Sequence, residues 1–304
     1  MTAPSAIDPR DWALLLFLSV LWGGSYLFVG IAVRELDPLV IVLVRVSIAA
    51  LALIPIHLSV QGPLPQSLAT WRAFAVMAFL NNVIPFSLIV TGQSLITAGL
   101  ASIINATTPL FTFAVMAAAG QERVLGHKVA GLFLGLAGVV ILRGGDLLAR
   151  DQQLAGILFC LGAAFSYGLA GFWAKRRLTG VPALTSATCQ LLCSSLMMAP
   201  LAAGFGNVTG LAAASGQAWA SLIAFALLST AFAYIVFFKI VSRSGPFAVM
   251  LVTMLIPVSA IALGAAVLGE RIAAREVAGA LVIATALLLI DGRAPGFLRR
   301  SRSA

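Results

Sequence analysis

The chain has 304 residues, of which 61% are hydrophobic and only 10% are charged. Soluble domains carry roughly 25% charged residues, so this composition excludes a soluble globular protein. The formal net charge of +9 does not indicate nucleic-acid binding, because the basic residues stand in short clusters between apolar runs and in the C-terminal tail. The three cysteines lie inside apolar runs without metal-ligand spacing, so neither a metal site nor a disulfide framework is expected.

Long apolar runs separated by polar or turn residues recur along the chain. Each must supply about 20 apolar residues to cross about 30 Å of hydrocarbon. The runs show no period-two alternation, so their backbone hydrogen bonds must be closed within helices rather than in a barrel. No cleavage motif follows the first run, which we expect to remain as a helix. The sequence therefore predicts an all-α integral membrane protein with ten transmembrane helices, at 11–33, 39–60, 71–92, 98–119, 128–144, 154–174, 184–204, 217–240, 247–268 and 274–291.

Lysine and arginine are distributed unevenly between the two sides of this expected topology. Cytoplasmic connections are enriched in these residues, so the bias places both termini in the cytoplasm and predicts a multi-pass protein of the cell inner membrane. The inner side holds Arg10, Arg72, Arg123, Lys128, Lys175, Arg176, Arg177, Lys239, Arg243, Arg293, Arg299, Arg300 and Arg302, and the outer side holds Arg34, Arg143, Arg150, Arg271 and Arg275.

The second half of the chain repeats the first. A shift of 148 residues aligns Glu122-Arg123 with Glu270-Arg271, Val129-Ala130-Gly131 with Val277-Ala278-Gly279, and Pro109 with Pro257. Five helices is an odd number, so the second copy enters the membrane from the opposite side. We therefore expect two inverted five-helix repeats around a central cavity, at 1–146 and 147–292, followed by a basic cytoplasmic tail at 293–304. Inverted repeats of this kind are typical of transporters.

Acidic residues stand near the ends of the predicted spans and not at their middle. No histidine and carboxylate pair suggests a buried proton relay, a metal site or acid/base catalysis. This pattern argues against an enzyme and against proton coupling through an intramembrane carboxylate. It favours facilitated diffusion without a cofactor.

Neutral polar residues do lie near the middle of several spans. The shift of 148 places Asn81 and Asn82 on Ser229 and Thr230, and it places Asn105 on Thr253. Amides both donate and accept hydrogen bonds, so such a lining could hold a zwitterion or another polar metabolite. The alternative is that these side chains bond between helices as packing contacts.

Aromatic and hydroxyl residues accompany them. The first span places Trp22, Ser25 and Tyr26 on one helical face, and the sixth contributes Ser166 and Tyr167. Positions midway along a span do not suit an interfacial aromatic belt, which favours an amphipathic ligand. The candidate substrate-binding residues are Trp22, Ser25, Tyr26, Asn81, Asn82, Asn105, Ser166, Tyr167, Thr230, Tyr234, Thr253 and Met254.

Three further features have a functional and a structural interpretation. Pro109 and Pro257 remove backbone donors at equivalent positions, so we expect them to bend helices four and nine, as hinges or as static kinks. Arg45 lies within the second span; it either attracts a substrate carboxylate or, the interpretation we favour, snorkels outward or contacts a carbonyl. Gly131-x-x-x-Gly135 permits close helix packing, within the chain or between the subunits of a homodimer.

The order and spacing of several motifs resemble the drug/metabolite transporter superfamily in its EamA branch. The motifs are Trp22-Gly23-Gly24-Ser25-Tyr26 with Arg45 in the next helix, Asn105-Ala106-Thr107-Thr108-Pro109 before Glu122-Arg123, and Pro257 before Gly269-Glu270-Arg271. Gln121 departs from the pattern, since the second half has Gly269 there. The resemblance implies a cavity lined by helices one, three, four, six, eight and nine, and it points to the aromatic-amino-acid exporters.

The leading hypothesis is a transporter that exports amino acids or related small metabolites by alternating access. The substrate and the lipid bilayer are the expected partners, and nucleic acid is not. The alternatives are a carrier for other metabolites or drugs, a membrane-embedded enzyme, and a sensor or scaffold. An enzyme would need an acid/base constellation, which the predicted spans lack. A sensor or scaffold would leave the matched polar residues without a role.

Overall fold

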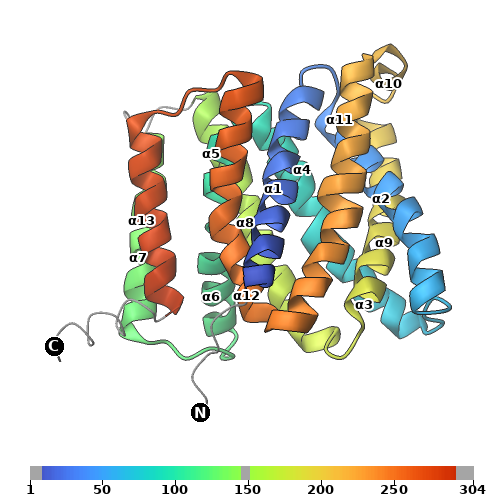
Figure 1. The fold of residues 1–304 in the computed structure, drawn as a ribbon, viewed down its shortest axis with the longest axis horizontal. Helices are drawn as coiled ribbons and strands as arrows, with labels where there is room; N and C mark the ends of the chain where they lie inside the picture. Colours follow the sequence, from blue (N-terminus) through green and yellow to red (C-terminus); the bar gives the residue numbers. More distant parts are fainter. Residues whose placement is uncertain (1–8, 145–150, 292–304) are drawn as a thin grey trace.

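The structure is a computed structural model that describes residues 9–144 and 151–291, and this described part is built of helices (Figure 1). Eight helical stretches are long and apolar enough to cross a membrane, and the apolar stretch Val252–Leu268 is shorter. The eight stretches are Arg10–Ala32, Pro38–Val60, Leu68–Gln93, Ala98–Ala118, Gly126–Arg143, Gln152–Arg177, Ala183–Phe205 and Gly216–Phe237. The protein is thus an all-α, multi-pass membrane protein.

Several of these stretches contain more than one helical element. The α-helices are α1 (Pro9–Ala32), α2 (Pro38–Val60), α3 (Leu68–Ala78), α4 (Ile84–Gln93), α5 (Ala98–Asn105), α6 (Thr108–Ala118), α7 (Gly126–Arg143), α8 (Gln152–Arg177), α9 (Ala183–Phe205), α10 (Gly210–Ala213), α11 (Gly216–Ala226), α12 (Ala233–Leu263) and α13 (Ala274–Asp291). The π-helical segments are η1 (Phe79–Val83), η2 (Leu227–Phe232) and η3 (Gly264–Leu268).

The boundary between the eighth and ninth expected runs differs from the sequence-based expectation. The residues from Ala233 to Leu263 form one helical element, α12, whereas the apolar runs predicted a connection between residues 240 and 247. Figure 1 nevertheless shows the chain running down along α11 and up along the later part of α12. Helix α13 spans eighteen residues, as many as the stretch Gly126–Arg143, but it carries three charged residues, Arg275, Glu276 and Asp291.

The π-helical turns fall at equivalent places in the two halves. Segments η1 and η2 both begin at positions related by the shift of 148, at Phe79 and Leu227. The two amides that bond five residues back also correspond: Gln121 N–H donates to the Met116 carbonyl at 2.8 Å, and Gly269 N–H donates to the Gly264 carbonyl. The halves therefore share departures from regular helix as well as apolar runs, and such π-bulges are frequent at functional sites.

Helices α7 and α13 lie side by side at one edge of the molecule (Figure 1). Glycines make their close approach possible, because a Cβ at Gly138 would stand 3.0 Å from the Gly279 carbonyl oxygen. A Cβ at Gly131 would meet the Ala286 carbonyl oxygen at 2.9 Å, and one at Gly135 would meet the Leu110 side chain. The Gly131-x-x-x-Gly135 motif is thus used for packing within the chain.

Two carboxylates join the halves outside the helices. Glu35 accepts hydrogen bonds from the Ser215 N–H at 2.8 Å and the Ser215 hydroxyl at 2.7 Å. These bonds stabilise the ionised form and lower the pKa of Glu35. Glu270, in the second half, accepts hydrogen bonds from two backbone N–H groups of the first half, those of Ala98 at 2.8 Å and Gly99 at 3.2 Å. It therefore caps the N-terminus of α5.

The α7–α13 contact predicts different outcomes for two glycine substitutions. Gly138→Ala is expected to destabilise the protein by about 1–3 kcal/mol, because the new methyl group would collide with the backbone of α13. Gly204→Ala in α9 is the matched control, since a Cβ there meets no atom within 4 Å. Thermal unfolding of the purified protein in detergent checks this, and equal midpoints for the two variants would contradict it.

Candidate functional site

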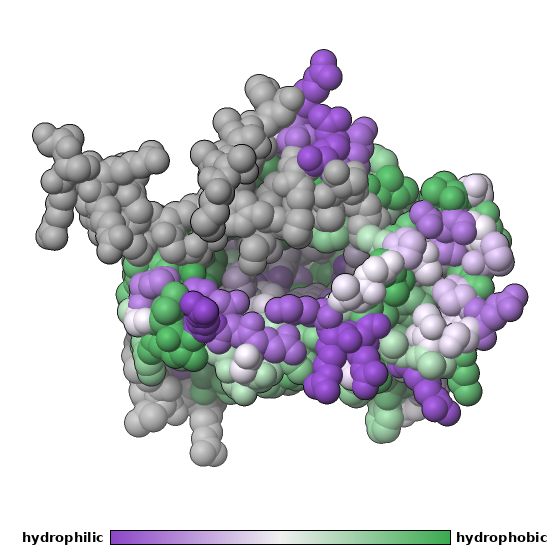
Figure 2. All heavy atoms as spheres, turned by 90° about the horizontal axis from the view of Figure 1, so that it is seen from below, coloured by the Kyte–Doolittle hydropathy of each residue, from purple (hydrophilic) through white to green (hydrophobic). Residues whose placement is uncertain are grey.

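A cavity of about 600 Å³ lies between the helices, with walls from both halves of the chain. Its size falls within the range of small-molecule sites, about 300–1,000 Å³. At one end it reaches Leu178 and Val181 in the α8–α9 connection. Figure 2 looks at this end of the molecule and shows a hollow near the centre of the face. No residue of the connections at the opposite end, 33–37, 94–97, 206–215 and 269–273, is part of the described lining. The cavity therefore opens toward the α8–α9 side.

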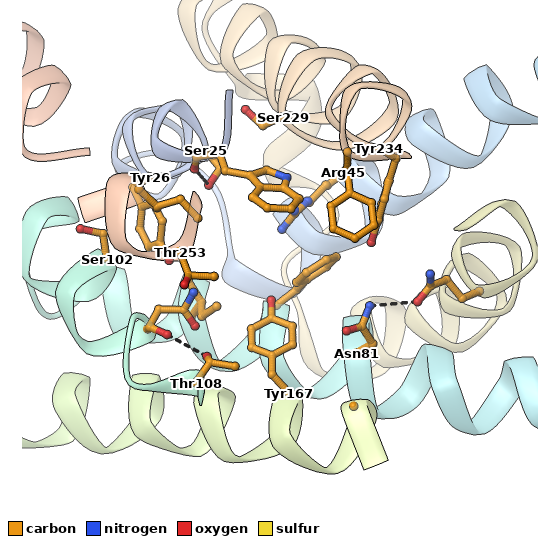
Figure 3. Close-up of a pocket in the computed structure, with 18 of the residues that line it drawn as sticks. Ser25, Tyr26, Arg45, Asn81, Ser102, Thr108, Tyr167, Ser229, Tyr234 and Thr253 are labelled. Carbon is orange, nitrogen blue, oxygen red and sulfur yellow. Dashed lines mark hydrogen bonds between the residues drawn. The ribbon is translucent and has the colours of Figure 1, made fainter. Parts of the chain in front are cut away.

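Eight of the residues proposed from sequence belong to the lining. They come from α1, η1, α5, α8 and α12, which are far apart in the chain, and Figure 3 shows several of them pointing into one space. The eight are Trp22, Ser25, Tyr26, Asn81, Asn105, Tyr167, Tyr234 and Thr253. Ser229, the counterpart of Asn81 at the shift of 148, also lines the cavity.

The other four candidates lie outside the lining. Asn82 is fully buried and its amide donates to the Ser194 hydroxyl at 2.9 Å, which ties η1 to α9. The hydroxyl of Ser166 donates to the Leu80 carbonyl at 2.7 Å. Thr230 donates to the Phe225 carbonyl at 3.0 Å, and Met254 packs against the hydrophobic core. These residues hold the helices that carry the cavity walls.

The tyrosine residues of the chain gather at the cavity. The protein has three tyrosines, Tyr26, Tyr167 and Tyr234, and all three line it. Trp22 packs against Phe237 with a centroid separation of 5.7 Å, and both belong to the lining. A wall of phenol and indole groups offers apolar area together with polar tips, which suits an amphipathic ligand.

Arg45 is the charged member of the described lining. The structure places its side chain in the cavity wall rather than at the outer surface, which differs from the snorkelling that we favoured from sequence. Its Nε donates to the Thr230 hydroxyl at 3.0 Å, and the guanidinium lies over the rings of Phe86 at 3.6 Å and Phe225 at 4.1 Å. Thr230 therefore positions Arg45 instead of lining the site.

Two glutamines were missed by the sequence analysis. Gln93 is buried at the end of α4, and its Nε2 donates to the Tyr26 carbonyl at 3.0 Å. Gln190 in α9 accepts a hydrogen bond from the Asn81 amide at 2.9 Å, which Figure 3 marks. Gln93 stands at the end of an apolar run, where a polar residue is ordinary, and Gln190 follows the small polar residues of α9. The only sequence signal for either glutamine as a site residue is a side-chain amide within an apolar run.

The two prolines proposed as hinges stand in different surroundings. Helix α5 ends at Asn105 and α6 begins at Thr108, so the fourth span is broken just before Pro109. Pro257 lies inside α12, which continues to Leu263. Only the first copy therefore has a break in the helix, and the expected bend at equivalent depths stays a prediction. The hinge stays a prediction.

In the part of the chain that the structure describes, charged side chains other than Arg45 lie outside the cavity lining. No Asp or Glu belongs to the lining formed by the described residues, and these residues contain no cluster of metal-ligating side chains. Glu122 pairs with Lys128 at 2.6 Å near the end of α6. The hydrogen bond from Lys128 lowers the pKa of Glu122. His57 is buried in α2, outside the lining.

A multi-pass helical bundle with a small-molecule cavity shared by two related halves defines a membrane transporter as the class of protein. The family model described as the EamA-like transporter family matches residues 11–144 and again 154–291. The chain belongs to this family, and it is not an enzyme.

Known proteins of similar sequence cover nearly the whole chain. The Bacillus subtilis protein named uncharacterized transporter YoaV is 24% identical over 90% of this chain and 94% of its own length. A Salmonella typhimurium protein named probable amino-acid metabolite efflux pump is 26% identical, over 92% and 94%. One protein of known crystal structure shares the fold, with a TM-score of 0.63 at 17% identity over 93% of this chain and 96% of that one.

The placement of the two asparagines predicts separable effects. Asn82→Ala is expected to lower the free energy of unfolding by about 1–2 kcal/mol, because it removes a buried hydrogen bond between η1 and α9. Asn81→Ala removes a lining residue, so we expect the larger loss in substrate uptake and the smaller change in thermal stability. Paired measurement of unfolding midpoints and flux for both variants checks this, and the reverse order would contradict it.

Proposed function

We propose that this chain is an inner-membrane carrier that exports amino acids or related small metabolites by alternating access. Ten transmembrane helices form two inverted five-helix repeats in this proposal, with both termini in the cytoplasm. The observation that carries it is the cavity built from both halves, open toward the α8–α9 side and without lining residues from the opposite connections. Under the proposed topology, the open side is the cytoplasmic one.

The chemistry of the lining supports a small polar metabolite with an apolar part. Asn81, Asn105 and Gln93 supply amides, and three tyrosines and Trp22 supply aromatic surface. The name of the Salmonella typhimurium relative supports the same class of substrate. The second candidate is a carrier for other metabolites or drugs, which the large apolar share of the wall favours, and the proposed substrate-binding residues would serve either.

Facilitated transport is the simplest mechanism for this lining. A proton-coupled carrier of this size commonly uses a carboxylate or histidine in the membrane, and the described wall contains neither. Substrate movement down its own gradient then needs no cofactor and no coupling ion. The proposal is that the binding of substrate alone biases the exchange between the two open states.

Counterflow in proteoliposomes, measured against a panel of amino acids and their metabolites, tests the function. We expect flux of at least one member of the panel, about tenfold or more reduced by Trp22→Ala and by Tyr167→Ala, since each removes a side chain from the wall. Flux for no amino acid or related metabolite would sink the proposal.

A second measurement tests the mechanism. Flux of the transported compound is expected to be unchanged when an inward or outward pH gradient is imposed at constant membrane potential, because the described cavity offers no proton-carrying carboxylate. Empty liposomes and Tyr167→Ala vesicles control for passive leak. Accumulation driven by the pH gradient would replace facilitated transport with proton coupling.

A further inference from the structure

Arg45 stands in the cavity wall without a carboxylate partner. None of the ion pairs in the described part of the chain includes it, and its hydrogen bond there is the one from Nε to Thr230. The guanidinium carbon lies 3.6 Å from the centre of the Phe86 ring and 4.1 Å from the centre of the Phe225 ring. A guanidinium carries five N–H donors and binds carboxylates through two parallel hydrogen bonds along its edge. The bond to Thr230 uses Nε, so the N–H groups of the two terminal nitrogens are left to bind a carboxylate.

The positive charge of Arg45 requires a counterion in the cavity. An arginine within the membrane is costly and is normally paired or faces an aqueous pathway. The described lining holds Arg45 and no Asp or Glu, so no side chain of the wall balances the charge. Figure 3 shows Arg45, Tyr167 and Tyr234 pointing into the same space, which adds phenol groups beside the cation. A bound monoanion would bring the net charge of this site to zero.

The same described lining offers no carboxylate to a substrate amine. An ammonium group would find neutral acceptors only, and a bound zwitterion would leave the site with its positive charge. The side-chain oxygens of Asn105 and Gln93 are buried and accept no hydrogen bond within the described part of the chain. A change of side-chain rotamer would turn either oxygen toward the cavity, where it would accept from a neutral N–H or O–H of a substrate. The wall thus matches one carboxylate, one neutral donor and an apolar body.

We propose that Arg45 binds the carboxylate of the transported substrate, and that this carrier therefore prefers organic monoanions with an apolar or aromatic body over zwitterionic amino acids. The inference rests on the proposed transport function and deepens it. Amino acids whose nitrogen is acylated fit this description, because they keep the carboxylate and a neutral N–H but have lost the ammonium charge.

Three compounds with one aromatic body test the preference. N-acetylphenylalanine is a monoanion, phenylalanine is a zwitterion and N-acetylphenylalanine amide is neutral. In wild-type proteoliposomes we expect the monoanion to move at least tenfold faster than the neutral amide, and faster than phenylalanine. Only the flux of the monoanion should respond to a membrane potential set with potassium and valinomycin. Equal rates for acid and amide, or a faster rate for phenylalanine, would overturn the proposed preference.

Substitutions then assign the effect to Arg45. Arg45→Gln is expected to lower the flux of the monoanion by about 10- to 100-fold, the size of a lost charge-assisted contact, while the amide changes little. Arg45→Lys keeps the charge without the two-pronged edge and should be intermediate. Arg34→Gln, which removes an exposed positive charge outside the cavity, is the matched control.

The outcomes separate this inference from the proposed function. Equal loss of all three fluxes in Arg45→Gln, with a folded size-exclusion profile, means that Arg45 only cross-links α2 to η2, and the inference fails while transport stands. Flux of other amino-acid metabolites but of none of these three rejects the inference alone. Absence of flux for every compound of both panels rejects the proposed function.

Discussion

The bilayer supplies no water to an unpaired backbone group, and the rest of this structure depends on that constraint. A carrier must open a polar cavity inside hydrocarbon, yet each departure from regular helix frees an amide or a carbonyl. The departures that lie at the cavity are η1, η2 and the break between α5 and α6, and each is satisfied by side chains or by wider turns. Thr230 donates to the Phe225 carbonyl, five residues earlier, and Thr108 donates to the Asn105 carbonyl at 2.7 Å. The polar residues thus stabilise the irregular backbone that exposes them.

This constraint explains why polar residues occur as matched pairs with divided roles. In η1, Asn81 lines the cavity and Asn82 bonds to α9; in η2, Ser229 lines the cavity and Thr230 holds Arg45. The residue that faces the cavity is the first of each pair, and the two first residues correspond at the shift of 148. The duplication therefore preserved which residue lines the cavity and which one supports it, while the residue types changed.

The apolar runs, the duplication and eight of the cavity residues could be predicted from the sequence, because helix length and residue register are local properties of the chain. The roles of Asn82 and Thr230 could not, because adjacent residues of a π-helical turn point in different directions and no hydropathy pattern reports that turn. Arg45 illustrates the same limit. Its position within a span is evident from sequence, but its contacts come from α4, α11 and η2, more than forty residues away. Only the tertiary packing distinguishes a snorkelling arginine from one that faces a cavity.

The two copies of the Glu-Arg motif make the ends of the cavity unequal. Glu270 caps α5 in the other half of the chain, whereas its counterpart Glu122 pairs with the nearby Lys128. The cap lies at the end that contributes no connection to the lining, and the α8–α9 connection lines the opposite, open end. At the shift of 148, Lys128 corresponds to Glu276, so Glu270 has no equivalent lysine to pair with, and the two ends differ in composition as well as in contacts. In the alternating access proposed above, opening of the closed end would require α5 to lose the carboxylate of Glu270. The net free-energy change of that step is small only if the freed N–H groups meet water.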